Sequence, residues 1–255
     1  MEMELNYFKS PAYGELCKRV FGGDMKQIGM VTADELELLY REVLLQPNSN
    51  ILDIGCGAGY IASAVAKHYN SSVTGIDIHV GTIEHAKKTF SDNLALHFHV
   101  MDATEMTFEA ESFDLICFFD TLYFESIKKV RLLLDKCFNM LKPNGKIIVF
   151  WTNQPANTPY GYIETFEMSE PSANNTQVGL WCNDNQVNFK AFDLTETHRL
   201  FWIKGLAEYK ALELELTNEM PEEYKLSMGE FSNNANLCEK GDDGGFFRWF
   251  YIIEK

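Results

Sequence analysis

The sequence predicts an α/β fold: a seven-stranded, mostly parallel sheet with helices on both faces and a helical, aromatic cap. Short apolar segments rich in Val, Ile or Phe alternate with segments of helical pattern, which is typical of strands joined by crossover helices. One of these segments runs directly into a glycine-rich turn at residues 55–59, as a first strand of such a sheet would. The 255 residues, 46% of them hydrophobic, are enough to bury a full core.

Each element follows from a local pattern. Strands are expected near residues 50–54, 72–76, 95–100, 113–118, 145–151, 188–194 and 244–253, and helices near 60–69, 80–90, 126–141, 195–214 and 221–239. Thr32 and Glu35 have the spacing of a capping box, which predicts a further helix that ends at about Val43. The turn at Pro143–Gly145 is expected to end the helix at 126–141 and to start the fifth strand.

The predicted organisation is one core with two additions. Residues 32–151 are expected to form the core that holds the main site, and residues 1–31, rich in aromatic residues and glycine, to form a segment that covers that site. Residues 152–255 contain an insertion far too long for a simple loop, followed by the last strands. We expect this insertion to cap the substrate site, and the site to lie at the carboxyl ends of the strands.

The motif that ends the first strand indicates a ligand. Gly55, Gly57 and Gly59 let the backbone approach a bound molecule because no Cβ stands in the way, and the next helix presents free N–H groups there. Asp53 adds a carboxylate, which suits a cationic group rather than a phosphate. Asp77 ends the next strand at the spacing expected of an acid that binds ribose hydroxyls.

This spacing favours S-adenosylmethionine over a nicotinamide cofactor. The dinucleotide fingerprint requires G-x-G-x-x-G, and its third glycine position falls on Tyr60 in this chain. The glycines instead form G-x-G-x-G, which ends at Gly59. The alternative is a tight turn that binds no ligand. That alternative does not explain why Asp53 and Asp77 flank the glycines.

With three further signatures, this pattern resembles the class I S-adenosylmethionine-dependent methyltransferases, a family with a Rossmann-like fold. The likeness covers the chain from about Thr32 to Phe150. Its signatures are the glycine motif at 51–60 with Asp77, the adenine-edge segment at 101–103, the fourth strand at 113–120, and the turn at 141–145. They occur in the family's order and spacing.

The resemblance implies a cofactor role for ten residues. The methionine end would lie on Asp53, Gly55, Cys56, Gly57 and Gly59, the ribose on Asp77, and the adenine on Ile78, Asp102 and Ala103, while Asp120 would help to close the site. The cofactor supplies the reactivity in this family, so the protein mainly orients the acceptor and excludes water.

A second, less specific likeness is to phosphoethanolamine-type and related small-molecule methyltransferases. It is carried by the N-terminal run from Asn6 to Thr32, the run from Phe192 to Trp202, and the start of the last strand at 248–251. That group pairs a catalytic tyrosine with a histidine after the fourth strand, where this chain has Phe124. A small acceptor other than a phosphorylated base is therefore favoured.

This second likeness also implies roles in catalysis and in acceptor binding. Tyr7 and Tyr123 are the expected catalytic residues, and Arg248 would lie near a substrate phosphate if one were present. Tyr13, Trp151 and Trp181 are further candidates, because aromatic faces attract a methylated ammonium group by about 0.5–2 kcal/mol each. Ordinary core or lid packing is the alternative for each aromatic residue.

Composition narrows the class of partner. The net charge of −15 argues against binding to a nucleic-acid backbone, which requires Lys and Arg to neutralise phosphates. The six cysteines have no CxxC or metal-ligand spacing, which indicates a reducing cytosol and no metal. The N-terminus has no apolar signal core, and no apolar run approaches the ~20 residues of a membrane span.

The sequence thus predicts a cytoplasmic S-adenosylmethionine-dependent methyltransferase, a monomer or homodimer, that methylates nitrogen or oxygen of a small metabolite. It is expected to bind neither nucleic acid nor membrane. The alternatives are a protein or RNA methyltransferase of the same fold, and a non-catalytic module that binds S-adenosylmethionine.

Overall fold

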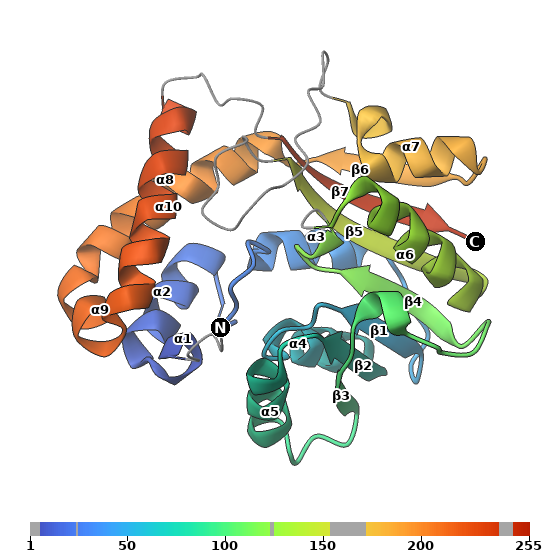
Figure 1. Cartoon of the computed structure of the whole chain (residues 1–255), viewed down its shortest axis with the longest axis horizontal. Coiled ribbons are helices and arrows are strands. Elements are labelled where there is room, and N and C mark those ends of the chain that lie inside the picture. The colour runs from blue at the N-terminus through green and yellow to red at the C-terminus, as the bar shows by residue number, and fades with distance from the viewer. Residues whose placement is uncertain (1–5, 24, 123–124, 154–171, 240–246) are drawn as a thin grey trace.

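A computed structural model describes residues 6–23, 25–122, 125–153, 172–239 and 247–255 of the chain. They form a seven-stranded sheet with helices on both faces and a group of helices at one side (Figure 1). The strands are β1 Asn50–Ile54, β2 Ser72–Asp77, β3 Leu96–Val100, β4 Phe113–Phe118, β5 Leu141–Asn153, β6 Phe189–Asp193 and β7 Phe247–Glu254. The predicted fold class is confirmed.

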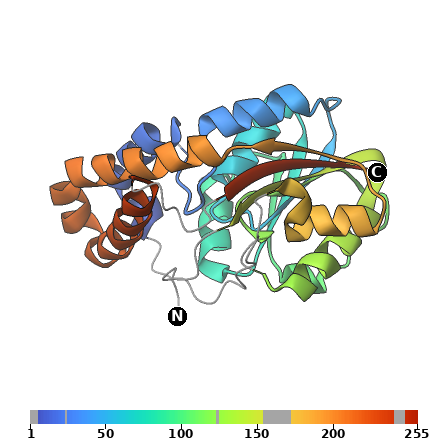
Figure 2. The ribbon, with the colours of Figure 1, turned by 90° about the horizontal axis from the view of Figure 1, so that it is seen from above.

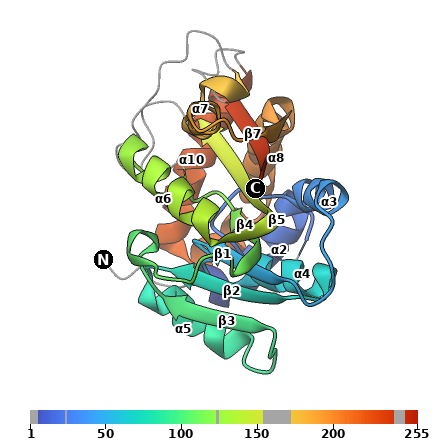
Figure 3. The same ribbon diagram turned by 90° about the vertical axis from the view of Figure 1, so that its right-hand side faces the viewer.

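The order of the strands determines where a ligand can bind. The order is β3-β2-β1-β4-β5-β7-β6, in which β1 to β5 are parallel and β7 is antiparallel to both β5 and β6. Figure 3 shows the strands fanning from β3 to β7. The chain runs outward from β1 in one direction and from β4 in the other, so a crevice forms at the carboxyl ends of these two strands.

The helices of the core flank this sheet. They are α3 Ala33–Glu42, α4 Tyr60–Tyr69, α5 Val80–Thr89, α6 Ile127–Met140 and α7 Gln177–Asp184, with short 3-10 turns η1 Ala103–Glu105 and η3 Ala173–Asn175. Helices α3 and α4 lie on one face of the sheet, and α6 and α7 on the other (Figure 3). The capping box of α3 is confirmed, because the Thr32 hydroxyl accepts from the Glu35 N–H at 3.2 Å and the Glu35 carboxylate accepts from the Thr32 N–H at 3.0 Å.

Two local predictions differ from the structure. Strand β5 begins at Leu141, which pairs with Phe113, and the predicted turn is an irregularity within β5 where Asn144 takes a φ of 65°. Helix α7 was not expected, since its eight residues are too few for a clear helical period. The first residues of the predicted last strand, 244–246, lie outside the described residues.

A cap is built from both ends of the sequence. It consists of α1 Asn6–Lys9 and α2 Pro11–Phe21 from the N-terminus, with α8 Thr195–Ala211, α9 Glu213–Glu219 and α10 Pro221–Glu239. Figures 1 and 2 show these two groups side by side. Glu219 joins them, because its carboxylate accepts from the Ser10 hydroxyl at 2.5 Å and from the Ala12 N–H at 3.1 Å at the start of α2. The segments predicted to cover cofactor and substrate separately therefore form one cap.

Apolar side chains fill the space between sheet and helices. Phe150 on β5, Phe250 on β7 and Phe192 on β6 stack in a row, with ring centroids 4.6 and 5.7 Å apart. Phe119 extends this row beyond the end of β4, 5.8 Å from Phe150. Within the described ranges, no helix is both long and apolar enough to cross a membrane.

Candidate active site

The glycine loop leaves one place open. Gly55, Gly57 and Gly59 have φ values of 76°, 53° and 80°, in the left-handed region where glycine is strongly preferred. A Cβ on Gly55 would lie 2.3 Å from the Thr121 hydroxyl, and one on Gly59 would lie 2.5 Å from the Phe98 ring. A Cβ on Gly57 would meet no atom within 4 Å. The loop is thus packed against the protein at both ends and open to a ligand in the middle.

Asp53, just before this loop, carries a carboxylate that lacks a partner. The residue is 1% exposed, and neither of its side-chain oxygens has a hydrogen-bond partner among the described residues. Burial, with the nearby charge of Asp77, raises the pKa of Asp53 to about 8. Because an unpaired buried carboxylate is costly, the site fits a ligand that brings a positive charge or N–H donors to it. The sulfonium and ammonium groups of S-adenosylmethionine meet that requirement.

Asp77 ties the end of β2 to the glycine loop. One carboxylate oxygen accepts from the Gly57 N–H at 3.0 Å, and the other accepts from the His79 N–H at 2.9 Å. Asp77 therefore lies beside the open part of the loop, where the sequence predicts that the ribose binds. Cys56 packs inside the loop, and burial raises the pKa of its thiol, which keeps it a neutral packing group.

The predicted adenine residues lie at the ends of β2 and β3. Ile78 is 60% exposed although it is apolar, so its side chain is free to cover a flat ring. Asp102 accepts from the N–H and the hydroxyl of Thr104, both at 2.8 Å, and these bonds lower its pKa. Both bonds involve the same Asp102 oxygen, Oδ1. Ala103 follows as the first residue of η1.

Asp120 lies two residues beyond β4 and is bound on two sides. Its backbone has a φ of 54°, which is unusual for a residue with a Cβ, and its side chain is buried. The carboxylate accepts from the Met30 N–H at 2.7 Å and from Arg248 Nη1 at 2.6 Å. Asp120 thus joins the end of β4 to the N-terminal segment and to β7.

Arg248, predicted to lie near a substrate phosphate, pairs with the protein's own carboxylates in this structure, and its role toward a substrate stays a prediction. Arg248 is fully buried, and its guanidinium donates to the carboxylates of Glu35 and Asp120 and to the Thr152 hydroxyl, at 2.6 to 3.3 Å. Burial works against its charge, but the two carboxylates outweigh burial and raise the Arg248 pKa. With two carboxylates around one guanidinium, the cluster has no positive charge left for an anionic substrate.

The two N-terminal tyrosines lie inside the cap. The Tyr7 hydroxyl is 3.1 Å from the Ser227 hydroxyl and donates to the Glu223 carbonyl at 3.4 Å, and burial raises the Tyr7 pKa. The Tyr13 hydroxyl donates to the Gln27 carbonyl at 2.5 Å. In this arrangement both hydroxyls bond to the protein, so their roles toward an acceptor stay predictions. Tyr123 lies outside the described residues.

The two candidate tryptophans have different surroundings. Trp151, near the carboxyl end of β5, has a buried indole N–H with no partner among the described residues, so it offers a donor to a ligand. Trp181 on α7 donates to Asp135 on α6 at 2.8 Å, and its ring packs against Phe138. Trp181 therefore joins two helices on one face of the sheet, and its role toward a substrate stays a prediction.

Glu35 is the site residue that sequence reasoning missed. The capping box already explains why a glutamate occupies this position, so no sequence pattern indicated that Glu35 also binds another residue. The structure adds a paired contact, in which Arg248 Nε donates to one Glu35 oxygen at 2.6 Å and Nη2 donates to the other at 3.0 Å. The partners are 213 residues apart in sequence, and only the fold brings them together.

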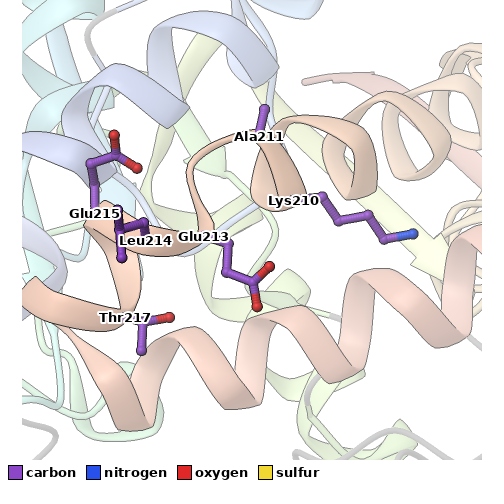
Figure 4. A pocket seen from close by; sticks show the side chains of 6 residues that line it. All are labelled: Lys210, Ala211, Glu213, Leu214, Glu215 and Thr217. Carbon is purple, nitrogen blue, oxygen red and sulfur yellow. The ribbon is translucent and has the colours of Figure 1, made fainter.

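A separate hollow lies on the cap, away from these residues. It is open, has a volume of about 630 Å³, and lies between the end of α8 and α9 (Figure 4). Its lining consists of Lys210, Ala211, Glu213, Leu214, Glu215 and Thr217. None of the predicted site residues lines it, so the candidate active site stays at the ends of β1, β2 and β4.

Comparisons with known proteins show which family the central part of the chain resembles. Residues 51–145 match the family described as a methyltransferase domain. A ubiquinone biosynthesis O-methyltransferase of Coxiella burnetii is 28% identical over 52% of this chain and 55% of its own length. A phosphoethanolamine N-methyltransferase of Triticum aestivum is 32% identical over 53% of this chain and 26% of its own length. The chain thus spans about half the length of the first relative, and less of the second.

The fold extends beyond the matched domain. The structure of a Haemonchus contortus phosphoethanolamine N-methyltransferase, in complex with phosphomonomethylethanolamine and S-adenosylhomocysteine, superposes with a TM-score of 0.74. The alignment covers 95% of this chain and 56% of that chain, at 17% sequence identity. At that identity the likeness shows a shared fold, including the cap and the last strands.

Proposed function

Since residues 51–145 of this chain form a methyltransferase domain, we propose that the protein transfers a methyl group from S-adenosylmethionine to nitrogen or oxygen of a small metabolite. The observation that carries this proposal is the unpaired, buried carboxylate of Asp53 beside the open position at Gly57. A cationic ligand with an adenosyl group would pair with Asp53 and reach Asp77 and the exposed Ile78.

The bound cofactor would supply an electrophilic methyl group on its sulfonium sulfur. The residues of this chain would bind, orient and shield it. Asp53 would face the positive end of the ligand, Asp77 the ribose, and Ile78, Asp102 and Ala103 the adenine. The cap would keep water from the acceptor, and the Trp151 indole N–H would be available to a polar acceptor atom.

The test is isothermal titration of S-adenosylmethionine, S-adenosylhomocysteine and NAD into the purified protein. We expect the two adenosyl ligands to bind and NAD to give no heat of binding. Binding of NAD alone, or of none of the three, would contradict the proposed cofactor. A screen of small metabolites for methyl transfer follows from a positive result.

We further propose that the acceptor carries no phosphate. The relatives act, by their names, in ubiquinone biosynthesis and on phosphoethanolamine, so both nitrogen and oxygen acceptors are candidates. The neutralised Arg248 and the position of Phe124 in the sequence argue against the phosphorylated one. Efficient methyl transfer to phosphoethanolamine, compared with ethanolamine under the same conditions, would contradict this choice.

The remaining expectations stand as part of the same proposal. The net charge of −15 supports a small acceptor without nucleic acid, and the six free cysteines are compatible with a reducing cytoplasm. A monomer or homodimer, and catalytic roles for Tyr7 and Tyr123, stay predictions.

A further inference from the structure

We propose that Asp120 and Arg248 form a latch that holds the Gly29–Met30 segment over the cofactor site, with Arg248 as the positioning residue. The latch is defined as the bonds from Met30 to Asp120 and from Asp120 to Arg248. The proposal rests on the proposed function, because the latch matters for a cofactor that lies between the glycine loop and the end of β4.

The first step is the contact between the N-terminal segment and Asp120. The Met30 N–H donates to Asp120 Oδ2 at 2.7 Å, which is a short, charge-assisted bond. A Cβ on the neighbouring Gly29 would lie 3.3 Å from both the Cβ and Oδ2 of Asp120. The segment therefore approaches the carboxylate about as closely as its backbone allows, and glycine provides the room.

The second step is the fixed orientation of Asp120. Arg248 Nη1 donates to Oδ1 at 2.6 Å, and Nη2 is 3.3 Å from Oδ2, so both carboxylate oxygens face the guanidinium fork. Arg248 is in turn held by Glu35 on α3 and by Thr152 on β5. Residues from three elements thus determine where the Asp120 carboxylate lies.

The third step connects the latch to the glycine loop. Thr121, next to Asp120, fills the space into which a Cβ on Gly55 would project, with its Cγ2 atom 2.4 Å from that position. The turn after β4 therefore contacts the Gly29–Met30 segment through Asp120 and the glycine loop through the following residue, Thr121. Its left-handed φ of 54° at Asp120 is an unfavourable backbone conformation that the bonds to Met30 and Arg248 stabilise.

The test uses Asp120→Asn and Arg248→Lys, with Asp135→Asn as the matched control. Asp135→Asn also removes a carboxylate that accepts a bond, but Asp135 on α6 and its partner Trp181 on α7 belong neither to the cap nor to the latch. We expect at least tenfold weaker S-adenosylmethionine binding for both latch variants, measured well below their melting temperatures, and no change for Asp135→Asn. Lysine keeps the charge but lacks the fork that orients Asp120.

Unchanged cofactor affinity in folded Asp120→Asn or Arg248→Lys protein would overturn the proposal and leave the cluster a purely structural one. Amide hydrogen exchange of Met30 in the unmodified protein gives a readout that needs neither variant nor cofactor. We expect that amide to exchange at least tenfold more slowly than in an unstructured peptide. If the Met30 amide exchanges at the rate of an unstructured peptide, the latch is overturned even if the proposed cofactor binds. If the amide exchanges slowly and no cofactor binds, the result instead contradicts the proposed function.

Discussion

Gly55 and Gly57 have similar backbone conformations and opposite surroundings. Both have a positive φ, so an alanine at either position costs about 1–2 kcal/mol of backbone strain. At Gly55 the added Cβ would also clash with Thr121, whereas at Gly57 it would enter open space. Substitutions at the two positions therefore test separately whether the loop needs glycine for folding or for binding a ligand.

We predict that Gly57→Ala folds with a modest loss of stability and binds S-adenosylmethionine at least tenfold more weakly, because the new Cβ occupies the ligand's space. Gly55→Ala is expected to lower the melting temperature much more than Gly57→Ala does. Thermal unfolding and isothermal titration of both variants test this pair. Equal cofactor affinity of Gly57→Ala and the unmodified protein would contradict a ligand at this position.

We expect Asp53 to make cofactor binding depend on pH. Its pKa near 8 in the ligand-free fold, raised from 3.8 by burial, means that the folded protein holds a proton which the unfolded chain releases above pH 4. The stability of the ligand-free protein should therefore fall as the pH rises from about 4 to 8. A cationic ligand favours the ionised carboxylate, so binding should expel the proton.

We predict that affinity for S-adenosylmethionine rises with pH up to about 8 and then levels off. The proton release is measured by titration calorimetry in two buffers of different ionisation enthalpy at pH 7. Asp53→Asn should lose the proton release and bind the cofactor at least tenfold more weakly. A proton release that persists in Asp53→Asn would assign it to another group.

At the scale of the element, the two long cap helices each contain a glycine, one packed against a neighbouring helix and the other exposed. Gly205 on α8 faces Phe231 on α10, and a Cβ there would lie 2.0 Å from the Phe231 ring. Gly229 on α10 is exposed, and a Cβ there would meet nothing within 4 Å. The first glycine permits the close contact of α8 with α10, and the second only weakens its helix.

We predict that Gly205→Ala loosens the cap and that Gly229→Ala stabilises it by about 0.5–1 kcal/mol through helix propensity. Hydrogen exchange of α8 and α10, together with the melting temperature, measures both effects. Unaltered protection of α8 in Gly205→Ala would mean that Phe231 moves aside without cost, against the close packing described above.

At the scale of the whole molecule, charge and topology act together. The net charge of −15 opposes the approach of polyphosphates, while the sheet brings Asp53, Asp77 and Asp120 to one edge. We predict no retention of RNA on the protein at physiological salt in a filter-binding assay. Retention that weakens steeply with added salt would support the RNA methyltransferase alternative instead.

The central elements could be predicted because their signals are local. The strand before the glycines, the capping box of α3 and the helix at Tyr60–Tyr69 each depend on residues a few positions apart. The cofactor loop likewise needs only the spacing of three glycines between two acids. These parts of the fold and of the candidate site could therefore be predicted from the sequence.

The contacts that the sequence did not predict join residues that lie far apart in the chain. Arg248 was predicted to lie near a substrate phosphate from the likeness to phosphoethanolamine-type methyltransferases, and its partners Glu35 and Asp120 lie 213 and 128 residues away from it. The partner of Trp181, Asp135, likewise belongs to another helix. No pattern of neighbouring residues can reveal partners that are so far apart in the sequence.

The position of β7 between β5 and β6 has a consequence for synthesis on the ribosome. Met30 and Asp120 leave the ribosome long before residue 248, so a nascent chain can form the glycine loop and β1 to β5 while its arginine is still missing. Asp120 and Glu35 then carry two negative charges with no guanidinium between them. With the proposed latch, closure of the site would wait for residue 248, so we expect chains that stop short of β7 to hold the cofactor poorly.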